Sequence, residues 1–520
     1  MDMGKGHAGV DRRTLLGGLA AAGGATLLPR GAFAAGTPRR GGTLNACMIY
    51  NPAALDPITG RNGPDFNTLL ALYDGLTTLD PTTLDPKPGL AKSWTWKDPK
   101  TLVLDLQENV TFHDGTAFDA EAAKFNLDRA RTAPRSNAKA DASTVESVEV
   151  TGKHQVTLHL PQPNAALLTI LADRPGLMVS PTSIKNAKDG NVDRAPVGTG
   201  PFKFVSWQDN VRIELVRNDK YWRSGLPYLD RLVLNIINEQ QTALRTLIAG
   251  QNDLGINLDI QLKKVADRSP NLVTTLVPEM YIWGAYLNYG HPPLDNVKIR
   301  QALSYGIDRD AMNKVLASGL DLAGNGVIPS WHWACDPASY NLYTYQPDKA
   351  RKLLAEAGHP DGIEIPMLGW SDQTSMQRQE LAITQLAKAG IRVKLTPGTP
   401  QGTALEFFGP HKNGSARLAG MGGYGDPSQQ YDNLFGGKAF YNASGIELPG
   451  YRALYEATLA TTDREERKKA FAKLQRFVIE NALILTFLFQ TAPIIASKKV
   501  QGVVVDRLVK PRFHEAWLAA

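Results

Sequence analysis

The sequence predicts an α/β protein that carries a β-rich segment ahead of its main α/β part. Between residues 102 and 160, apolar and polar residues alternate in short runs, which is typical of half-buried strands. From about residue 292 onward, helical apolar stripes alternate with short strand patterns, as in sheets that are flanked by helices. The 47 glycines and 33 prolines agree with a chain of many turns.

Two hairpins are predicted in the β-rich segment. Apolar residues alternate over 102–106 and again over 110–112, with a polar turn between the two runs. A second pair of alternating runs, 148–150 and 156–160, is separated by the Gly-Lys pair at 152–153. Each pair is expected to form two adjacent antiparallel strands.

The α/β part shows helix starts and stops. We expect Asp308, Asp348 and Asp463 to cap three helices, because an Asp side chain accepts the free backbone N–H groups of a first turn. Gly390 is expected to end a further helix, since glycine adopts the left-handed conformation common at helix C-termini. Residues 391–395 then alternate as a strand directly after it.

The N-terminal residues 1–34 have the layout of an export signal. Arg12-Arg13 precedes a mildly apolar stretch over 15–28, and Ala32-Phe33-Ala34 offers a signal-peptidase site. A paired arginine before such a stretch predicts a Tat-type signal peptide, the Tat translocase as export partner and a periplasmic location. The alternative is a disordered N-terminal extension. No later segment has the length of a transmembrane helix, and the apolar run 482–489 fits a buried strand.

Charge and cysteine content exclude several classes of protein. The formal net charge of +6 is small for 520 residues, and the densest basic run, Arg464 to Lys469, is interrupted by two glutamates. A nucleic-acid-binding protein concentrates positive charge on one face, so we expect no nucleic acid partner. Cys47 and Cys335 are the two cysteines, and their separation favours buried thiols. No metal-ligand spacing is present, and we expect no cofactor.

No motif for catalysis is recognisable in the chain. Phe112-His113-Asp114-Gly115 is better explained as a strand followed by a tight turn than as an acid–base pair. The glycine-rich segments at 198–201 and 420–425 lack a Walker lysine and dinucleotide spacing. We therefore predict a protein that is not an enzyme. A Tat-exported periplasmic hydrolase or cofactor enzyme is the alternative, and a chaperone or docking subunit is a third.

Short motifs in a fixed order run through nearly the whole mature chain. They are Arg40-Gly41-Gly42-Thr43-Leu44, Leu72-Tyr73-Asp74-Gly75-Leu76, Gly89-Leu90-Ala91-Lys92-Ser93-Trp94, Val110 to Thr116, Pro196 to Phe202, Arg217 to Trp222, Asp295 to Leu303 and Ala350 to Gly362. Together they resemble the extracytoplasmic solute-binding proteins of family 5, the dipeptide/oligopeptide type of ABC transporter substrate-binding protein.

The resemblance implies an α/β two-lobe periplasmic-binding-protein (Venus-flytrap) fold with an additional β-rich domain inserted in the first lobe. It places lobe I at residues 36–75, 195–285 and 487–520, the extra domain at 76–194 and lobe II at 286–486. The implied function is to capture a small-molecule ligand between the lobes and deliver it to an ABC permease and ATPase complex at the inner membrane. We expect a monomer.

The resemblance also suggests where the ligand binds. Aromatic and polar residues are expected near the space between the lobes, and Arg378 is the candidate for a bidentate contact with a carboxylate or phosphate. Its alternative role is a solvated helix residue. The predicted ligand-binding residues are Arg61, Asn62, Tyr281, Trp283, Trp370, Arg378, Tyr424 and Asp426.

The cargo is less closely defined. Peptide-binding relatives hold the peptide amino group with an Asp four residues before a proline, and this chain has Gly423 four residues before Pro427. Asp426 is a possible substitute, although capping of the turn before Pro427 is the simpler role. Nickel-binding relatives place a histidine after the corresponding Asp-Pro, where this chain has Ser428. A peptide-like, amino-acid-derived or sugar-derived solute remains.

Overall fold

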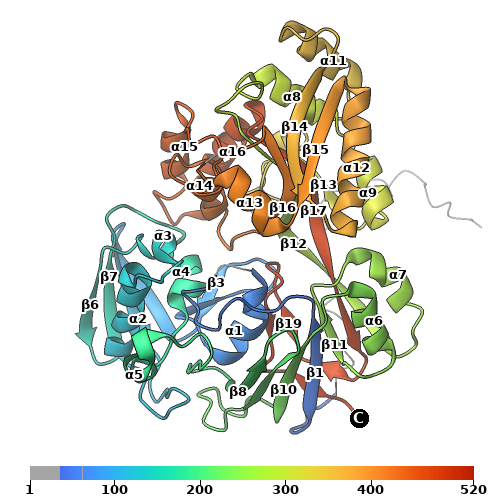
Figure 1. The fold of residues 1–520 in the computed structure, drawn as a ribbon. Coiled ribbons are helices and arrows are strands. Elements are labelled where there is room, and N and C mark those ends of the chain that lie inside the picture. The colour runs from blue at the N-terminus through green and yellow to red at the C-terminus, as the bar shows by residue number, and fades with distance from the viewer. Residues whose placement is uncertain (1–35, 61–62, 411) are drawn as a thin grey trace, which may run out of the picture. The chain divides into compact units, whose positions relative to one another are not determined.

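The computed structural model describes residues 36–60, 63–410 and 412–520. The predicted signal peptide, Arg61 and Asn62 lie outside the described residues. Figure 1 shows the arrangement of the helices and strands. Within the described ranges, no helix has both the length and the apolar character needed to cross a bilayer.

One 11-stranded mixed sheet runs through the structure, in the order β15-β14-β16-β12-β17-β11-β1-β10-β9-β8, with β13 paired to β17. Its strands are β1 (Thr43–Met48), β8 (Phe202–Gln208), β9 (Arg212–Arg217), β10 (Arg231–Ile236), β11 (Leu254–Ile256), β12 (Leu272–Leu287), β13 (Leu322–Ala323), β14 (Ile363–Trp370), β15 (Ile391–Gly398), β16 (Ala416–Met421) and β17 (Ile484–Ser497). The predicted buried strand at 482–489 is confirmed as the first part of β17.

The two longest strands, β12 and β17, join the two ends of this sheet. They pair antiparallel over most of their length, while β17 also pairs with β11 and β12 also pairs with β16. Both strands therefore belong to the group that ends at β8 and to the group that ends at β15 (Figure 1). The chain passes between the two groups along these strands.

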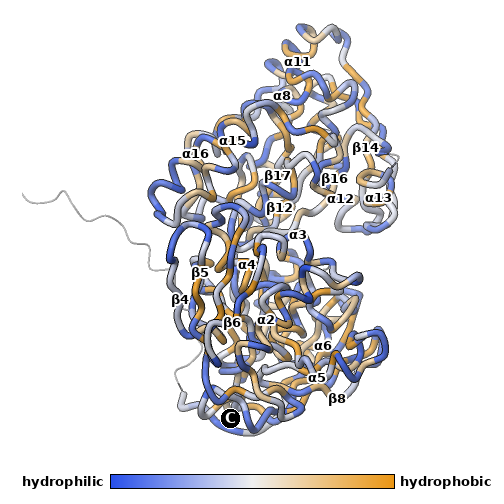
Figure 2. The backbone as a smooth tube through the Cα atoms, turned by 90° about the vertical axis from the view of Figure 1, so that its left-hand side faces the viewer, coloured by the Kyte–Doolittle hydropathy of each residue, from blue (hydrophilic) through white to orange (hydrophobic). Residues whose placement is uncertain are grey.

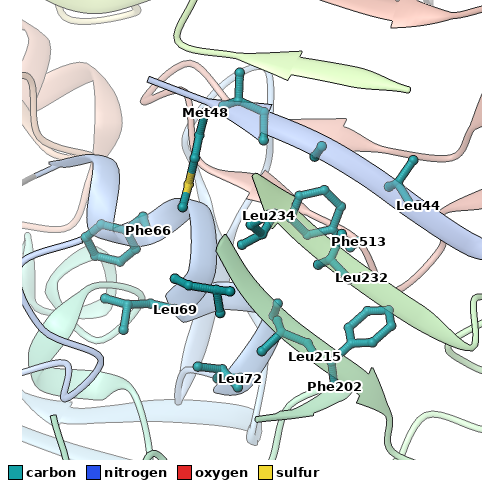
Figure 3. Close-up of a cluster of buried hydrophobic side chains, with 14 of the residues drawn as sticks. Leu44, Met48, Phe66, Leu69, Leu72, Phe202, Leu215, Leu232, Leu234 and Phe513 are labelled. Atoms are coloured by element: carbon teal, nitrogen blue, oxygen red, sulfur yellow. The ribbon is translucent and has the colours of Figure 1, made fainter. Parts of the chain in front are cut away.

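Separate hydrophobic cores form on the two ends of the sheet. In one, α1 (Phe66–Leu72) packs its apolar residues against β1, β9 and β10, as Figure 3 shows for Leu69 and Leu72 beside Leu215 and Leu234. In the other, β14, β15 and β16 are covered by helices that include α8 and α12. Each end of the sheet thus has its own hydrophobic core, formed between the sheet and the helices that cover it.

Sixteen α-helices and four 3₁₀-helices are present in the described ranges. The α-helices are α1, α2 (Ala120–Thr132), α3 (Lys139–Ala142), α4 (Leu167–Ile170), α5 (Pro181–Asn186), α6 (Gln240–Ile248), α7 (Lys263–Ala266), α8 (Val297–Tyr305), α9 (Arg309–Ala317), α10 (Pro337–Tyr340), α11 (Pro347–Glu356), α12 (Gln373–Lys388), α13 (Pro400–Phe408), α14 (Pro427–Phe435), α15 (Tyr451–Ala457) and α16 (Arg464–Glu480). The 3₁₀-helices are η1 (Gly63–Asp65), η2 (Arg174–Gly176), η3 (Lys188–Gly190) and η4 (Ile260–Leu262).

Most predicted helix ends are confirmed. The Asp308 side chain accepts the Ala311 N–H at the start of α9, and Asp463 does the same for Glu466 at the start of α16. Gly390, at φ +82°, follows α12 and leads into β15. The predicted cap at Asp348 is wrong. Helix α11 starts one residue earlier at Pro347, because proline is favoured at the first helical position, where no N–H bond is needed.

A four-stranded antiparallel sheet, in the order β4-β5-β7-β6, lies between residues 91 and 159. Its strands are β4 (Ala91–Asp98), β5 (Thr101–Leu106), β6 (Ser147–Gly152) and β7 (Gln155–His159). The apolar residues of β5 are buried against α2, whereas β4 is mostly exposed and hydrophilic (Figure 2). The predicted β6–β7 hairpin is confirmed.

The other predicted hairpin, over 102–112, is wrong. Strand β5 pairs with β4, which precedes it, and with β7, which lies about fifty residues further on. Val110 and Phe112 are buried in the same core as β5 but lie in a turn segment. Burial rather than strand pairing therefore explains their apolar spacing.

Three short two-stranded pairs complete the strands of the described ranges. They are β2 (Thr77–Leu79) with β3 (Pro86–Pro88), β18 (Val500–Gln501) with β21 (Trp517–Leu518), and β19 (Val504–Val505) with β20 (Pro511–Arg512). Cys47 and Cys335 are both buried, free thiols.

Candidate functional site

Arg378 lies on α12, at the place where this helix reaches the crossing strands β12 and β17. The helix is capped by Asp372, whose side chain accepts the Ser375 N–H at 3.0 Å. The Arg378 side chain is only 12% exposed and donates through Nη2 to Asp259 at 3.3 Å. It is therefore not a solvated helix residue.

Gln490 of β17 is the second partner of Arg378. With its amide oxygen facing the guanidinium, Gln490 accepts from Nη1 at 2.8 Å and from Nη2 at 3.1 Å. Asp259 is itself held in place, because its other oxygen accepts the Gln261 N–H at the start of η4. Arg378 thus joins three segments that are distant in sequence, and its guanidinium plane is set by two neighbours.

Two indole rings lie beside this guanidinium. Arg378 stands over Trp283 with 5.4 Å between its central carbon and the ring centroid. Trp370 packs edge-on against Trp283 at 5.5 Å. Trp283 is 1% exposed and belongs to the core behind β14, and neither indole Nε1 has a hydrogen-bond partner among the described residues. The Trp283 ring therefore packs against the guanidinium of Arg378, and Trp370 is the more exposed of the two rings.

Tyr281 of β12 faces the same group. Its hydroxyl lies against Gly420 of β16, where an added Cβ would be 1.7 Å from the oxygen. Burial and the neighbouring Tyr50 raise the pKa of Tyr281 well above its usual value. The phenol therefore stays neutral and can donate a hydrogen bond. Gly420 makes room for it.

The acidic residue Asp321 lies close to Arg378, beside β17. Asp321, which precedes β13, is 6% exposed and accepts the Thr491 N–H of β17 at 2.9 Å. Burial raises the pKa of Asp321 to about 6, and the opposing charge of Arg378 offsets only part of this effect. We name Arg378, Asp259, Asp321, Gln490 and Tyr281, with Glu279 of β12, the Arg378 cluster.

The structure places the other predicted residues elsewhere. Asp426 caps α14 by accepting the Ser428 N–H, and both of its oxygens contact Arg467 at 2.8–2.9 Å. Its carboxylate is used within the fold, as the simpler prediction had it. Tyr424 belongs to a different environment, in which burial and the nearby Asp141 raise the pKa of its phenol.

Gly423 has no space for a side chain. A Cβ built there would lie 2.1 Å from Cβ of Met280 and 2.8 Å from its carbonyl oxygen. Met280 belongs to β12 and is fully buried. This position therefore cannot supply a carboxylate without moving the strand that crosses between the two ends of the sheet.

A surface cavity of about 700 Å³ lies elsewhere, between α2 and α5. Its lining includes Thr116, Phe125, Pro181 and Ile184, and none of the predicted site residues that the structure describes. In addition, the described part of the chain holds no group of three or more His, Cys, Asp and Glu side chains placed to bind a metal ion. The Arg378 cluster remains the best-supported candidate site.

The sequence predicted Arg378 and Tyr281 of the Arg378 cluster and the neighbouring Trp283 and Trp370, but not the acidic and amide members of the cluster. Asp259, Asp321 and Gln490 carry no local signal, because their role depends on strands and loops that meet only in the folded chain. Glu279 did carry one. It is the single charged residue in the 16 residues of β12.

Comparisons with known proteins agree with this architecture. The model of the bacterial extracellular solute-binding proteins, family 5, matches residues 85–442. A glutathione-binding protein GsiB from Salmonella paratyphi A is 28% identical over 467 residues, which cover 87% of this chain and 90% of that protein.

Solved structures show the same fold. The binding protein DppA from Helicobacter pylori, in complex with the peptide STSA, has a TM-score of 0.82 at 23% identity and covers 93% of this chain and 99% of its own. A dipeptide-binding protein from Pseudoalteromonas sp. SM9913, in complex with Met-Leu, also has a TM-score of 0.82, at 22% identity, and covers 92% and 100%. The predicted two-lobe α/β fold is confirmed.

The Helicobacter pylori protein DppA is an ABC transporter-associated periplasmic binding protein, and the family model describes extracellular solute-binding proteins. The family match spans more than half of the chain, and the fold agrees over 93% of it. This chain belongs to the bacterial extracellular solute-binding proteins of family 5, and it is the substrate-binding component of an ABC importer.

Proposed function

We propose that this protein captures a small solute that carries a carboxylate, a peptide or an amino-acid- or sugar-derived molecule, and that Arg378 binds this carboxylate. The observation that supports the proposal is the placement of Arg378 in the Arg378 cluster, with Gln490 and Asp259 orienting its guanidinium. A guanidinium has five N–H donors, and the contacts with Gln490 and Asp259 use three of them, so donors remain for a carboxylate.

Aromatic surface beside Arg378 supports the same proposal. Tyr281 and Trp370 are both partly exposed next to it, and such rings supply much of the contact area in small-molecule sites. The molecules named for the relatives, glutathione and short peptides, all carry carboxylates. Tyr424 is proposed as a more distant contact, and Asp426 is left out because Arg467 and Ser428 already occupy it.

The remaining features of the proposal concern the whole protein. The chain acts without catalysis as a monomer in the periplasm, after Tat export and removal of residues 1–34. The proposed lobes keep the boundaries that the family resemblance implies, and the four-stranded sheet between residues 91 and 159 supports a β-rich extra domain at 76–194. N-terminal sequencing of the exported protein checks the export step, and a mature chain that still contains Arg12-Arg13 would contradict it.

The ligand-binding proposal is tested by thermal unfolding of the mature protein with glutathione and with a pool of free dipeptides. A true ligand at a hundredfold excess over its Kd stabilises the folded state by about 2.7 kcal/mol. We expect Arg378→Met to abolish this stabilisation, whereas Arg392→Met, at an exposed position on β15, leaves it intact. The bound compound is then recovered and identified.

Three results would contradict the proposal. Equal binding by the Arg378→Met variant would show that the guanidinium only supports the fold. Conversion of the compound during incubation would favour the enzyme alternative. Absence of stabilisation by every carboxylate-bearing probe would remove the proposed ligand class.

A further inference from the structure

The strand β12 contains a bulge opposite Gln490. Pro278 pairs with Thr491 and Ile282 pairs with Phe489, so Glu279, Met280 and Tyr281 stand against one residue of β17. A bulge of this kind redirects side chains away from the regular alternation of a strand. Met280 is buried in a small core with Leu79 and Leu84, and Glu279 is partly buried in the Arg378 cluster.

The Glu279 carboxylate has no partner in the described part of the chain. It accepts no hydrogen bond and makes no ion pair there, although backbone and side-chain donors satisfy Asp259 and Asp321 close by. The charged and titratable groups that face it are Asp321 and Arg378, together with the phenols of Tyr50 and Tyr281. Arg378 is shared with Asp259 and also with Gln490.

Negative groups therefore outnumber positive ones at this point. Glu279, Asp259 and Asp321 surround a single guanidinium, that of Arg378. Burial, reinforced by Asp321, raises the pKa of Glu279 to about 8. Burial without a neighbouring cation raises the free energy of an ionised carboxylate, so the protonated form is favoured. An unpaired acid of this kind inside a binding region calls for a positive group from outside the chain.

We propose that Glu279 accepts a protonated amine of the bound solute, so that Arg378 and Glu279 together select molecules carrying both a carboxylate and an ammonium group. The inference rests on the proposed function and narrows it to zwitterionic solutes such as free peptides and amino-acid derivatives. Gly423 cannot take this role, because Met280 fills the space that a side chain would need. Glu279 lies next to Met280 on β12, the strand that pairs with β16 ahead of Gly423, and its carboxylate takes the place of the one that Gly423 lacks.

Binding of an amine has a consequence for protons. The amine pairs with the ionised form of Glu279, whose pKa is about 8 in the free protein, and its positive charge lowers that pKa. Below pH 8 each binding event therefore releases a proton to the solvent. The affinity should rise as the pH is raised from 6 toward 8, by up to about tenfold per pH unit.

The experiment uses three forms of one dipeptide pool, which are free, N-acetylated and C-amidated, with thermal shift and titration calorimetry on the mature protein. We expect the free pool to bind, the N-acetylated pool to bind about tenfold to a hundredfold more weakly, and the C-amidated pool to lose the contact with Arg378. Glu279→Gln should bind the free and N-acetylated pools alike and lose the pH dependence. Glu364→Gln, an exposed change on β14, is the matched control.

The outcomes separate this inference from the function beneath it. Equal binding of the free and N-acetylated pools by the unaltered protein, or full affinity of Glu279→Gln for the free pool, would overturn the role of Glu279 alone. Failure of all three pools and of glutathione to bind would overturn the inference and the proposed function together. Proton release in calorimetry that disappears in Glu279→Gln supports it independently of the affinities.

Discussion

Two buried groups of charges in this molecule differ in how their charge is balanced. In one, Arg467 of α16 donates to one oxygen of Asp426 and lies within ion-pair distance of the other, and the two side chains are 8% and 6% exposed. Ser428 and Thr458 use the remaining hydrogen-bonding capacity of the pair. In the other, the Arg378 cluster, three carboxylates lie around one guanidinium, which pairs with Asp259, whereas Glu279 has no partner among the described residues.

The two groups show opposite effects on acidity for the same reason. Burial opposes ionisation of Asp426, but the charge of Arg467 and the Ser428 bonds hold its pKa below the usual value. Burial also opposes ionisation of Glu279, and the charge of Arg378 offsets only part of this effect, so its pKa is raised to about 8. A charge that the fold itself satisfies supports structure, whereas one that it leaves unsatisfied is available to a ligand.

The largest effect is expected when the balanced pair is broken. Arg467→Met leaves the buried Asp426 carboxylate without its cation and should lower the free energy of unfolding by about 3–5 kcal/mol in urea titrations at pH 7. Because the folded pKa of Asp426 is depressed, the contribution is present above pH 3.8 and is lost as the pH falls through the lower folded value. The difference between the proteins should therefore narrow in acid.

A second change checks the reason for this loss. Asp426→Asn added to Arg467→Met removes the unpaired charge and should recover part of the stability. If Arg467→Met alone were as stable as the unaltered protein, the pair would not be structural and the comparison would fail.

In the Arg378 cluster, we expect a substitution to raise the free energy of unfolding, by a smaller amount than Arg467→Met lowers it. Between pH 4.5 and about 8 the folded state binds more protons at Glu279 than the unfolded state, so the stability of the ligand-free protein falls as the pH rises. Glu279→Gln lacks this loss and should be more stable by about 1–2 kcal/mol at pH 8, a figure reduced for the partial solvation of the carboxylate. At pH 4 the two proteins should unfold alike. If the stability gained by Glu279→Gln over the unaltered protein were larger at pH 4 than at pH 8, Glu279 would have to be stabilised as a carboxylate in the native state.

The smallest effect is expected at an exposed pair. Arg464 Nη1 lies 3.1 Å from Asp85, and the two side chains are 48% and 36% exposed. Arg464→Gln should change the free energy of unfolding by less than about 0.5 kcal/mol, because water screens exposed ion pairs. The change should vanish in 1 M salt. A loss above 1 kcal/mol that persists in high salt would mean that exposure does not separate weak pairs from strong ones in this molecule.

Much of the local structure could be predicted from the sequence. The caps at Asp308 and Asp463 depend on contacts three residues apart, and the β6–β7 hairpin depends on a short turn. The failed hairpin after β5 has a different cause. The true partners of β5 are set by the packing of four strands, which no window of neighbouring residues contains.

The candidate site also contains residues that could be predicted from the sequence and residues that could not. Arg378 was predicted from its chemistry and its place in the family pattern, but its partners Asp259 and Gln490 lie more than one hundred residues away in the chain. The importance of Glu279 was readable only as a lone charge in a long apolar strand. The bulge that aims it depends on the register between β12 and β17.

The amino-acid sequence by itself determined the family, the α/β class and most helix ends, because caps, periodicity and short motifs act over a few residues. Only the tertiary structure decided which charges are paired. Whether a carboxylate is satisfied depends on which distant segments come within hydrogen-bond distance of it, and on how much water they exclude. Asp426 and Glu279 are both acidic residues beside a proline in the sequence, and folding places the first against Arg467 and leaves the second open.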